Sequence, residues 1–210
     1  MMRPRLYLLI FAVASGLAAC SSTSDAPTAR FTILGYPEDG GSVPGSRYEG
    51  EGDFASGEVI YTLMVEGEPA IERREIGTST YVRTVGEDDY YESDQTPESL
   101  AVRTVRNGLV ASPDAVEHLR SIADEVTEVG REEVRGTKTT HYRGVVHLAE
   151  MGAPREYDRF PIEVWIDDSG RTRRYSQHPL GSTETIVWEF YDFGVSVEDL
   201  VRPPPEKVRG

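Results

Sequence analysis

Alternating apolar and polar positions dominate the middle and the end of this chain. Residues 59–65 place Val59, Tyr61, Leu63 and Val65 on one side, and residues 160–166 show the same two-residue period. Because successive side chains of a strand point to opposite faces, this pattern predicts strands that bury one face. Further strands are predicted over residues 70–77, 80–85, 126–135, 139–149, 171–177 and 184–193.

Turn signals separate several of these strands. The clearest is Asp167-Asp168-Ser169-Gly170, which lies between two predicted strands. Asp favours the bend and Gly accepts a positive φ, so this segment predicts a hairpin.

Helical periodicity is clear in one segment only. Ser112 can cap it, with Pro113 at its first position, and the apolar residues Leu119 and Ile122 then recur at helical spacing. A second, weaker helix is predicted over residues 96–107, where an extended structure is nearly as consistent with the sequence.

The amino-terminal segment shows the pattern of an export signal, not that of a strand or helix of the folded domain. Two arginines precede a short apolar run that ends in Leu17-Ala18-Ala19-Cys20. A run of about a dozen apolar residues is too short for a permanent membrane span and is typical of a secretory signal peptide, here residues 1–19. The last four residues resemble a bacterial lipobox, in which the cysteine thiol accepts a diacylglyceryl group. Two acyl chains give stable anchoring, so we expect a protein held on the outer side of the cell membrane by Cys20.

The remaining chain divides into three parts. Residues 20–53 are rich in Ser, Gly and Pro and predict a flexible tether after the lipidated cysteine. Residues 54–202 predict one folded domain, and residues 203–210 predict a tail. The order of strands, helix or helices, and strands predicts an α+β fold. We expect a curved, mostly antiparallel half-barrel sheet with helices covering its concave face.

Charge and cysteine content exclude several classes of function and of site. The chain of 210 residues has a formal charge of −14, so it would repel phosphate backbones, and no nucleic-acid partner is predicted. Cys20 is the single cysteine, which excludes an internal disulfide and a thiolate metal cluster.

Catalytic and metal-binding motifs are absent from the sequence. His141 and His147 would lie about 20 Å apart along one strand, too far to share a metal, and are predicted to be solvated. No nucleophile motif, P-loop or HExxH motif occurs. The sequence therefore predicts no catalytic residue, no metal site and no cofactor, and the protein is not expected to be an enzyme.

Several segments of the body resemble a known family. They are Glu128–Gly136, Thr139–Tyr142, Pro161–Gly170 and Trp188–Gly194. Together with the lipobox, they resemble actinobacterial cell-envelope lipoproteins of the LppX/LprG type, which are related to the LolA/LolB carriers. The resemblance covers roughly residues 55–200. It implies a half-barrel sheet and, for the best understood members, an apolar cavity that carries lipid or acylated glycolipid.

Large apolar side chains on the predicted inner faces are the candidate lining of such a cavity. They are Tyr61, Leu63, Leu119, Ile122, Tyr142, Val146, Ile162, Val164, Trp188 and Phe190. The alternative is that these side chains pack a closed core. The expected function is lipid binding or transport by a membrane-anchored lipoprotein. The alternative function is a ligand-free adaptor or sensor that binds another envelope protein.

Overall fold

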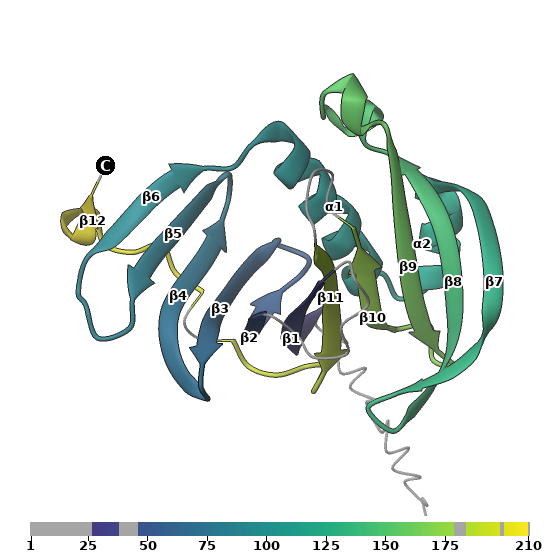
Figure 1. The fold of residues 1–210 in the computed structure, drawn as a ribbon, viewed down its shortest axis with the longest axis horizontal. Coiled ribbons are helices and arrows are strands. Elements are labelled where there is room, and N and C mark those ends of the chain that lie inside the picture. Colours follow the sequence, from purple (N-terminus) through teal and green to yellow (C-terminus); the bar gives the residue numbers. More distant parts are fainter. Residues whose placement is uncertain (1–26, 38–45, 179–183, 198–199, 210) are drawn as a thin grey trace, which may run out of the picture.

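The computed structural model describes residues 27–37, 46–178, 184–197 and 200–209. In this part of the chain, twelve strands form one mixed but almost wholly antiparallel sheet, accompanied by two α-helices (Figure 1). The fold is therefore α+β, as the sequence predicted. The predicted signal peptide and Cys20 lie outside the described residues.

The elements follow one another in two groups of strands separated by the helices. The strands are β1 (Thr28–Pro37), β2 (Ser46–Asp53), β3 (Glu58–Val65), β4 (Glu68–Ile76), β5 (Ser79–Thr84), β6 (Tyr90–Asp94), β7 (Ala123–Val134), β8 (Thr137–His147), β9 (Arg159–Asp167), β10 (Thr172–Gln177), β11 (Glu184–Tyr191) and β12 (Val208–Arg209). The α-helices are α1 (Pro97–Ala111) and α2 (Ala115–Ile122), and the 3₁₀ turns are η1 (Leu148–Met151), η2 (Arg155–Tyr157) and η3 (Pro205–Lys207).

The sheet consists of two antiparallel meanders joined side by side. Its strand order is β12-β6-β5-β4-β3-β2-β1-β11-β10-β9-β8-β7. The first meander runs from β1 to β6 and the second from β7 to β11, and they meet where β1 pairs with β11. In Figure 1 the two meanders form two wings of the sheet, α1 lies between them, and α2 lies at the second wing, where it contacts β7 and β8. The sheet is open, since β12 and β7 are its edges.

The predicted hairpin after β9 is confirmed. The Oδ1 atom of Asp167 accepts hydrogen bonds from the backbone N–H groups of Ser169 and Arg171, at 2.9 and 3.0 Å. Gly170 takes the positive φ of +82° that the turn requires. These contacts fix the register between β9 and β10.

Both predicted helices are present, with shifted ends. The N-cap of α2 is Asp114, whose side chain accepts hydrogen bonds from the N–H groups of Val116 and Glu117. Ser112, the predicted cap, instead ends α1. The weaker prediction, α1, extends four residues beyond Asn107 to Ala111, because its last turn buries Leu109 and Val110 in the core.

One hydrophobic core lies between the helices and the sheet. Phe31 on β1 is fully buried, and its ring centroid lies 4.9 Å from that of Trp188 and 5.9 Å from that of Phe54. Val105 and Leu109 of α1 belong to the same cluster. The Thr172 hydroxyl on β10 donates a hydrogen bond of 2.8 Å to the carbonyl of Leu109, which ties the end of α1 to the second meander.

The predicted tether is wrong for the described residues 27–37 and 46–53, where β1 and β2 form the centre of the sheet. The glycines that suggested a flexible tether instead allow neighbouring strands and side chains to pack closely. A Cβ atom on Gly50 would lie 2.3 Å from the carbonyl oxygen of Ile60 and 2.8 Å from the Phe31 ring. Glycine is therefore required where β2 passes between β3 and this ring.

The predicted carboxyl-terminal tail is also wrong for residues 203–209. The two residues of β12 pair in parallel with β6. Val208 packs against a small cluster of Ile76, Tyr81 and Tyr90, and burial of this side chain explains why the segment is ordered against the sheet edge. Neither described helix has the length and apolar character needed to cross a bilayer.

Candidate functional site

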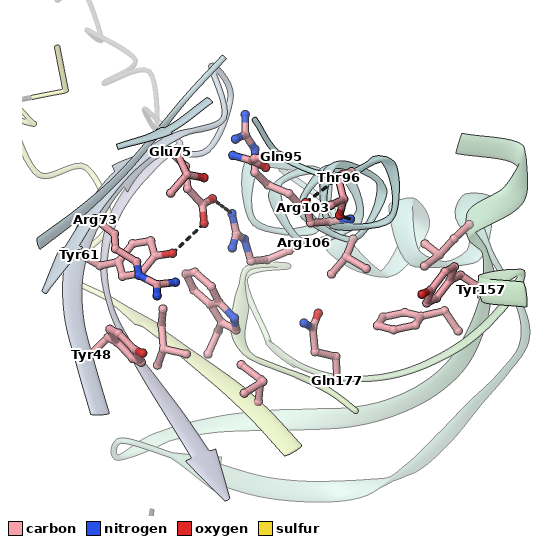
Figure 2. Close-up of a pocket in the computed structure, with 18 residues that line it drawn as sticks. Tyr48, Tyr61, Arg73, Glu75, Gln95, Thr96, Arg103, Arg106, Tyr157 and Gln177 are labelled. Atoms are coloured by element: carbon pink, nitrogen blue, oxygen red, sulfur yellow. Dashed lines mark hydrogen bonds and ion pairs between the residues drawn. The ribbon is translucent and has the colours of Figure 1, made fainter. Parts of the chain in front are cut away.

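A pocket of about 550 Å³ lies between α1 and the sheet (Figure 2). That volume falls within the range of about 300–1,000 Å³ that is usual for ligand sites. Side chains of both meanders, α1 and the η1–η2 segment line it. The apolar part of the lining consists of Ile33, Val102, Leu148, Phe160, Ile186 and Trp188, and the tyrosines are Tyr48, Tyr61 and Tyr157.

The local periodicities explain how α1 and β4 reach the pocket. Ser99, Val102, Arg103 and Arg106 recur at three- and four-residue spacing, so they share one face of α1. The helix face that carries Val105 and Leu109 packs into the core instead. On β4 the two-residue period of a strand places two charged side chains, at positions 73 and 75, on the pocket side.

One carboxylate organises the polar end of the pocket. Glu75 accepts a hydrogen bond of 2.9 Å from the Tyr61 hydroxyl at Oε1 and forms an ion pair with Arg106, at 3.3 Å, at Oε2. Figure 2 shows this chain of contacts at one end of the pocket. Burial, followed by the charge of Glu75, raises the pKa of Tyr61 above its ordinary value, so its phenol stays protonated.

Arg106 is held from three sides. It is buried, it donates to Asn107 Oδ1 at 2.9 and 3.0 Å, and its guanidinium carbon lies 3.9 Å from the centroid of a Trp188 ring. Cation–π contact and a buried carboxylate together stabilise a cation inside the fold. Arg106 and Glu75 therefore form a self-satisfied pair in the wall of the pocket.

Two further arginines at the pocket differ from Arg106. Arg103 donates a hydrogen bond of 2.6 Å to the carbonyl of Gly77 with Nη2, but its Nη1 atom is buried without a partner among the described residues. Burial lowers the pKa of Arg103 from its ordinary value. The Nε atom of Arg73 is likewise buried without a partner in the described part of the chain. Gln95 Nε2 and Gln177 Oε1, also in the lining, share this property.

Among the ten side chains proposed as cavity lining, Tyr61 and Trp188 line this pocket. The others lie elsewhere on the sheet and helices. Leu119, Val146, Ile162, Val164 and Phe190 are buried in the hydrophobic core, and Ile122 and Tyr142 pack against it. Leu63 is half-buried on β3, towards the end of the strand beyond Tyr61. Apart from Leu63, these residues belong to the core or pack against it, so other side chains fill the space in front of them.

The sequence interpretation missed the charged lining of the pocket. A signal for it existed in β4, where residues 72–75 are all charged. Because a strand turns alternate side chains to opposite faces, two of these four charges had to point inward. Arg103 and Arg106 give a similar signal on α1, at a spacing that places them on one helix face.

The histidines that were predicted to be solvated make specific contacts in the fold. His141 is not solvated as predicted: it is only 4% exposed, stacks on Trp165 with centroids 4.0 Å apart, and contacts Glu132 and Glu163. The aromatic stack covers its ring, which explains the burial. Within the described ranges, no group of three or more His, Cys, Asp or Glu side chains is arranged to hold a metal ion.

Comparison with known proteins gives structural relatives only. No family model and no curated protein matches the sequence. The structure of the lipoprotein LppX from Mycobacterium tuberculosis matches with a TM-score of 0.53 and 17% identity, over 82% of this chain and 89% of that one. LprF from Mycobacterium bovis matches with a TM-score of 0.49 and 13% identity, over 85% and 93% of the two chains. A LolA-superfamily protein from Nitrosomonas europaea has a TM-score of 0.35 and 12% identity, over 85% and 94%.

The match with LppX covers more than four fifths of both chains. It agrees with the resemblance noted in the sequence. This chain has the fold of the LppX-type lipoproteins.

Proposed function

We propose that this protein is a cell-envelope lipoprotein that binds lipid in the pocket between α1 and the sheet. The observation that carries this proposal is the pocket of about 550 Å³, whose lining includes Trp188, five other apolar side chains and three tyrosines. An acyl chain that enters such a space gains roughly 25 cal/mol for each Å² of apolar surface removed from water. The LppX-like fold supports the same function through the sequence resemblance.

In this proposal the two wings of the sheet form a half-barrel and α1 covers its hollow side. The helix contributes Val102 to the pocket. It is tied at its middle to the turn after β4, through Arg103 and Gly77, and near its end to β10, through Leu109 and Thr172. Lipid would enter beside α1 and leave the same way. No covalent step is required.

The anchor belongs to the same proposal. A diacylglyceryl group on Cys20 would hold the protein on the outer side of the cell membrane, near a source of lipid. The formal charge of −14 argues against adsorption of the folded body to anionic headgroups, so the lipid anchor would carry the attachment.

Lipid uptake by the full chain carrying Cys20→Ser tests the binding function, because this protein has no acyl group of its own. We expect co-purifying lipid by mass spectrometry and saturable uptake of a fluorescent alkyl probe. Val102→Phe would place a larger side chain in the pocket and should weaken uptake by about tenfold or more, since each displaced CH₂ group contributes about 0.8 kcal/mol.

The matched control is Val129→Phe, which makes the same change on an exposed position of β7. It should leave uptake unchanged. A protein with an unsubstituted pocket that contains no co-purifying lipid and takes up no probe would overturn the proposed function. That result would favour the ligand-free adaptor.

A further inference from the structure

The polar end of the pocket carries more positive than negative charge. Its lining contains Arg73, Arg103 and Arg106 but a single carboxylate, Glu75. The whole chain has the opposite balance, with a formal charge of −14. A local excess of two positive charges inside such an acidic protein is a feature of this pocket that lipid binding alone does not explain.

The carboxylate cannot neutralise the excess. Both oxygens of Glu75 already have partners, the Tyr61 hydroxyl at 2.9 Å and the Arg106 guanidinium at 3.3 Å. Arg73 and Arg103 form no ion pair with any described residue, although Arg103 donates one hydrogen bond to the neutral carbonyl of Gly77. Each presents a buried N–H group without an acceptor in the described chain.

Unpaired buried donors on charged groups are costly. Leaving one such donor unsatisfied costs about 1–3 kcal/mol, and more when the group is charged. An acceptor that enters the pocket can pair with a guanidinium that has no carboxylate partner among the described residues. A phosphate or carboxylate oxygen is suited to it, because guanidinium N–H groups match the geometry of both.

The other end of the pocket is apolar. Figure 2 shows Tyr157 at the end opposite Arg73 and Glu75. Tyr157 belongs to η2, which contacts η1, and both Leu148 of η1 and Phe160 at the start of β9 line the pocket. The pocket therefore has a cationic end on β4 and α1 and an apolar end at the η1–η2 segment.

We infer that the pocket is built for an anionic amphiphile, with the phosphate or carboxylate head bound by Arg73 and Arg103 and the alkyl chain directed towards Leu148 and Phe160. This inference rests on the proposed lipid-binding function and names the class of lipid. It assigns to Arg73 and Arg103 the selection of charged over neutral lipids. The Glu75–Arg106 pair forms the wall beside the head group.

The test compares ligands with the same chain and different heads. Hexadecanoate, hexadecyl phosphate and hexadecanol would each displace the fluorescent alkyl probe from the full chain carrying Cys20→Ser. Hydrogen bonds to charged groups contribute about 1.5–3 kcal/mol, so both anions should bind about tenfold to a hundredfold more tightly than the alcohol. Inorganic phosphate and acetate, tested alone, show whether the head without a chain is sufficient.

Arg73→Gln should weaken binding of both anionic amphiphiles by about tenfold and leave hexadecanol within about twofold. Arg73→Lys keeps the charge and should retain most of the preference. The unliganded Arg73→Gln protein should unfold at the same temperature or higher, because the change removes a buried unpaired donor. Arg103→Gln provides a second variant if Arg73→Gln does not fold. Arg131→Gln, an exposed position on β7, is the matched control and should change nothing.

The outcomes separate the two proposals. Equal binding of anion and alcohol, unaffected by Arg73→Gln, would overturn the inference and leave lipid binding intact. Binding of inorganic phosphate as tight as that of hexadecyl phosphate would overturn it in favour of a free-anion site. Failure of all the alkyl ligands to bind would overturn the lipid-binding function, and the inference with it.

Discussion

In this fold, whether a polar side chain is buried depends on its contacts more than on its position in the alternating pattern of a strand. His141 lies on the strand face that sequence alternation assigned to solvent, yet Trp165 stacks on it and Glu132 contacts both rings, at 3.0 Å from His141 Nδ1 and 2.9 Å from Trp165 Nε1. An aromatic neighbour and a shared carboxylate can bury a histidine on the outer face of a sheet. Periodicity alone does not reveal such a partner.

His147 makes the corresponding contacts near the surface. Its Nδ1 atom lies 3.3 Å from an oxygen of Asp158 and its Nε2 atom 3.1 Å from an oxygen of Asp124. These hydrogen bonds, led by that of Asp158, raise the pKa of His147 above its ordinary value. The Arg159 guanidinium is also close enough to interact with both carboxylates.

The pH dependence of stability tests the His147 contacts. A pKa that is higher in the folded than in the unfolded state stabilises the fold below about pH 6.5, and this stabilisation is lost as the pH rises through the folded value. We expect His147→Gln to lower the unfolding temperature more at about pH 5.5 than at about pH 8.5. Thermal unfolding followed by circular dichroism at both values is the measurement.

The control for this comparison is His178→Gln, whose ring contacts the Thr185 hydroxyl at 3.5 Å. It should show no comparable difference between the two pH values. An equal loss for His147→Gln at both values would show that its contacts with Asp124 and Asp158 do not depend on its charge.

At the scale of elements, β1 is the strand on which the sheet depends. It pairs with β2 on one side and with β11 on the other, and so joins the two meanders. The sequence around it is rich in Gly and Pro, and its large apolar residues are only Phe31, Ile33 and Leu34. Such a segment is typical of a linker when read alone, because nothing local indicates the two strands that will flank it.

Phe31 provides the test of this role. Its ring is fully buried and contacts the rings of Phe54, Tyr61 and Trp188. Phe31→Ala should therefore reduce the free energy of unfolding by about 3–5 kcal/mol, which is usual for loss of a core aromatic ring. Denaturant unfolding gives this value directly.

Arg30→Ala is the matched control on the same strand, because the Arg30 side chain is 54% exposed. Its effect should stay within about 0.5 kcal/mol. A loss below about 1 kcal/mol for Phe31→Ala would be expected of a tether and would contradict the packing of β1 described above.

At the scale of the whole molecule, the acidic body, the cationic pocket end and the expected anchor suggest a division of roles. A formal charge of −14 would repel anionic membrane surfaces. Arg73 of β4 and Arg103 and Arg106 of α1 place positive charge inside the pocket. Attachment to the membrane would then depend on Cys20. Recognition of an anionic lipid would depend on the pocket.

Replacement of Cys20 tests the attachment. In the native host, Cys20→Ser should either move the processed protein from the membrane fraction to the soluble fraction or leave its signal peptide uncut, because a serine hydroxyl cannot form the thioether. Fractionation followed by mass analysis of the amino terminus distinguishes these results. Cys20→Ser protein that is cleaved and still sediments with membranes would rule out the anchor.

The sequence by itself determined most of the local structure. Alternation located β3, β4, β5, β7, β8, β9, β10 and β11 within a few residues, and Asp167 and Gly170 predicted the hairpin between β9 and β10. These features depend on neighbours in the chain, so a single sequence contains them. The family resemblance correctly implied the LppX-type fold.

Only the tertiary structure decided which inward-facing side chains line a pocket and which pack against one another. The placement of α1 leaves Trp188 and Tyr61 beside open space, while Phe190 and Val164, on the same kind of strand position, are covered. It also brings Arg73 of β4 and Arg103 of α1 into the lining of the same space. Whether such a side chain is covered depends on residues far away in the sequence. The periodicity of a single segment contains no information about where those residues lie.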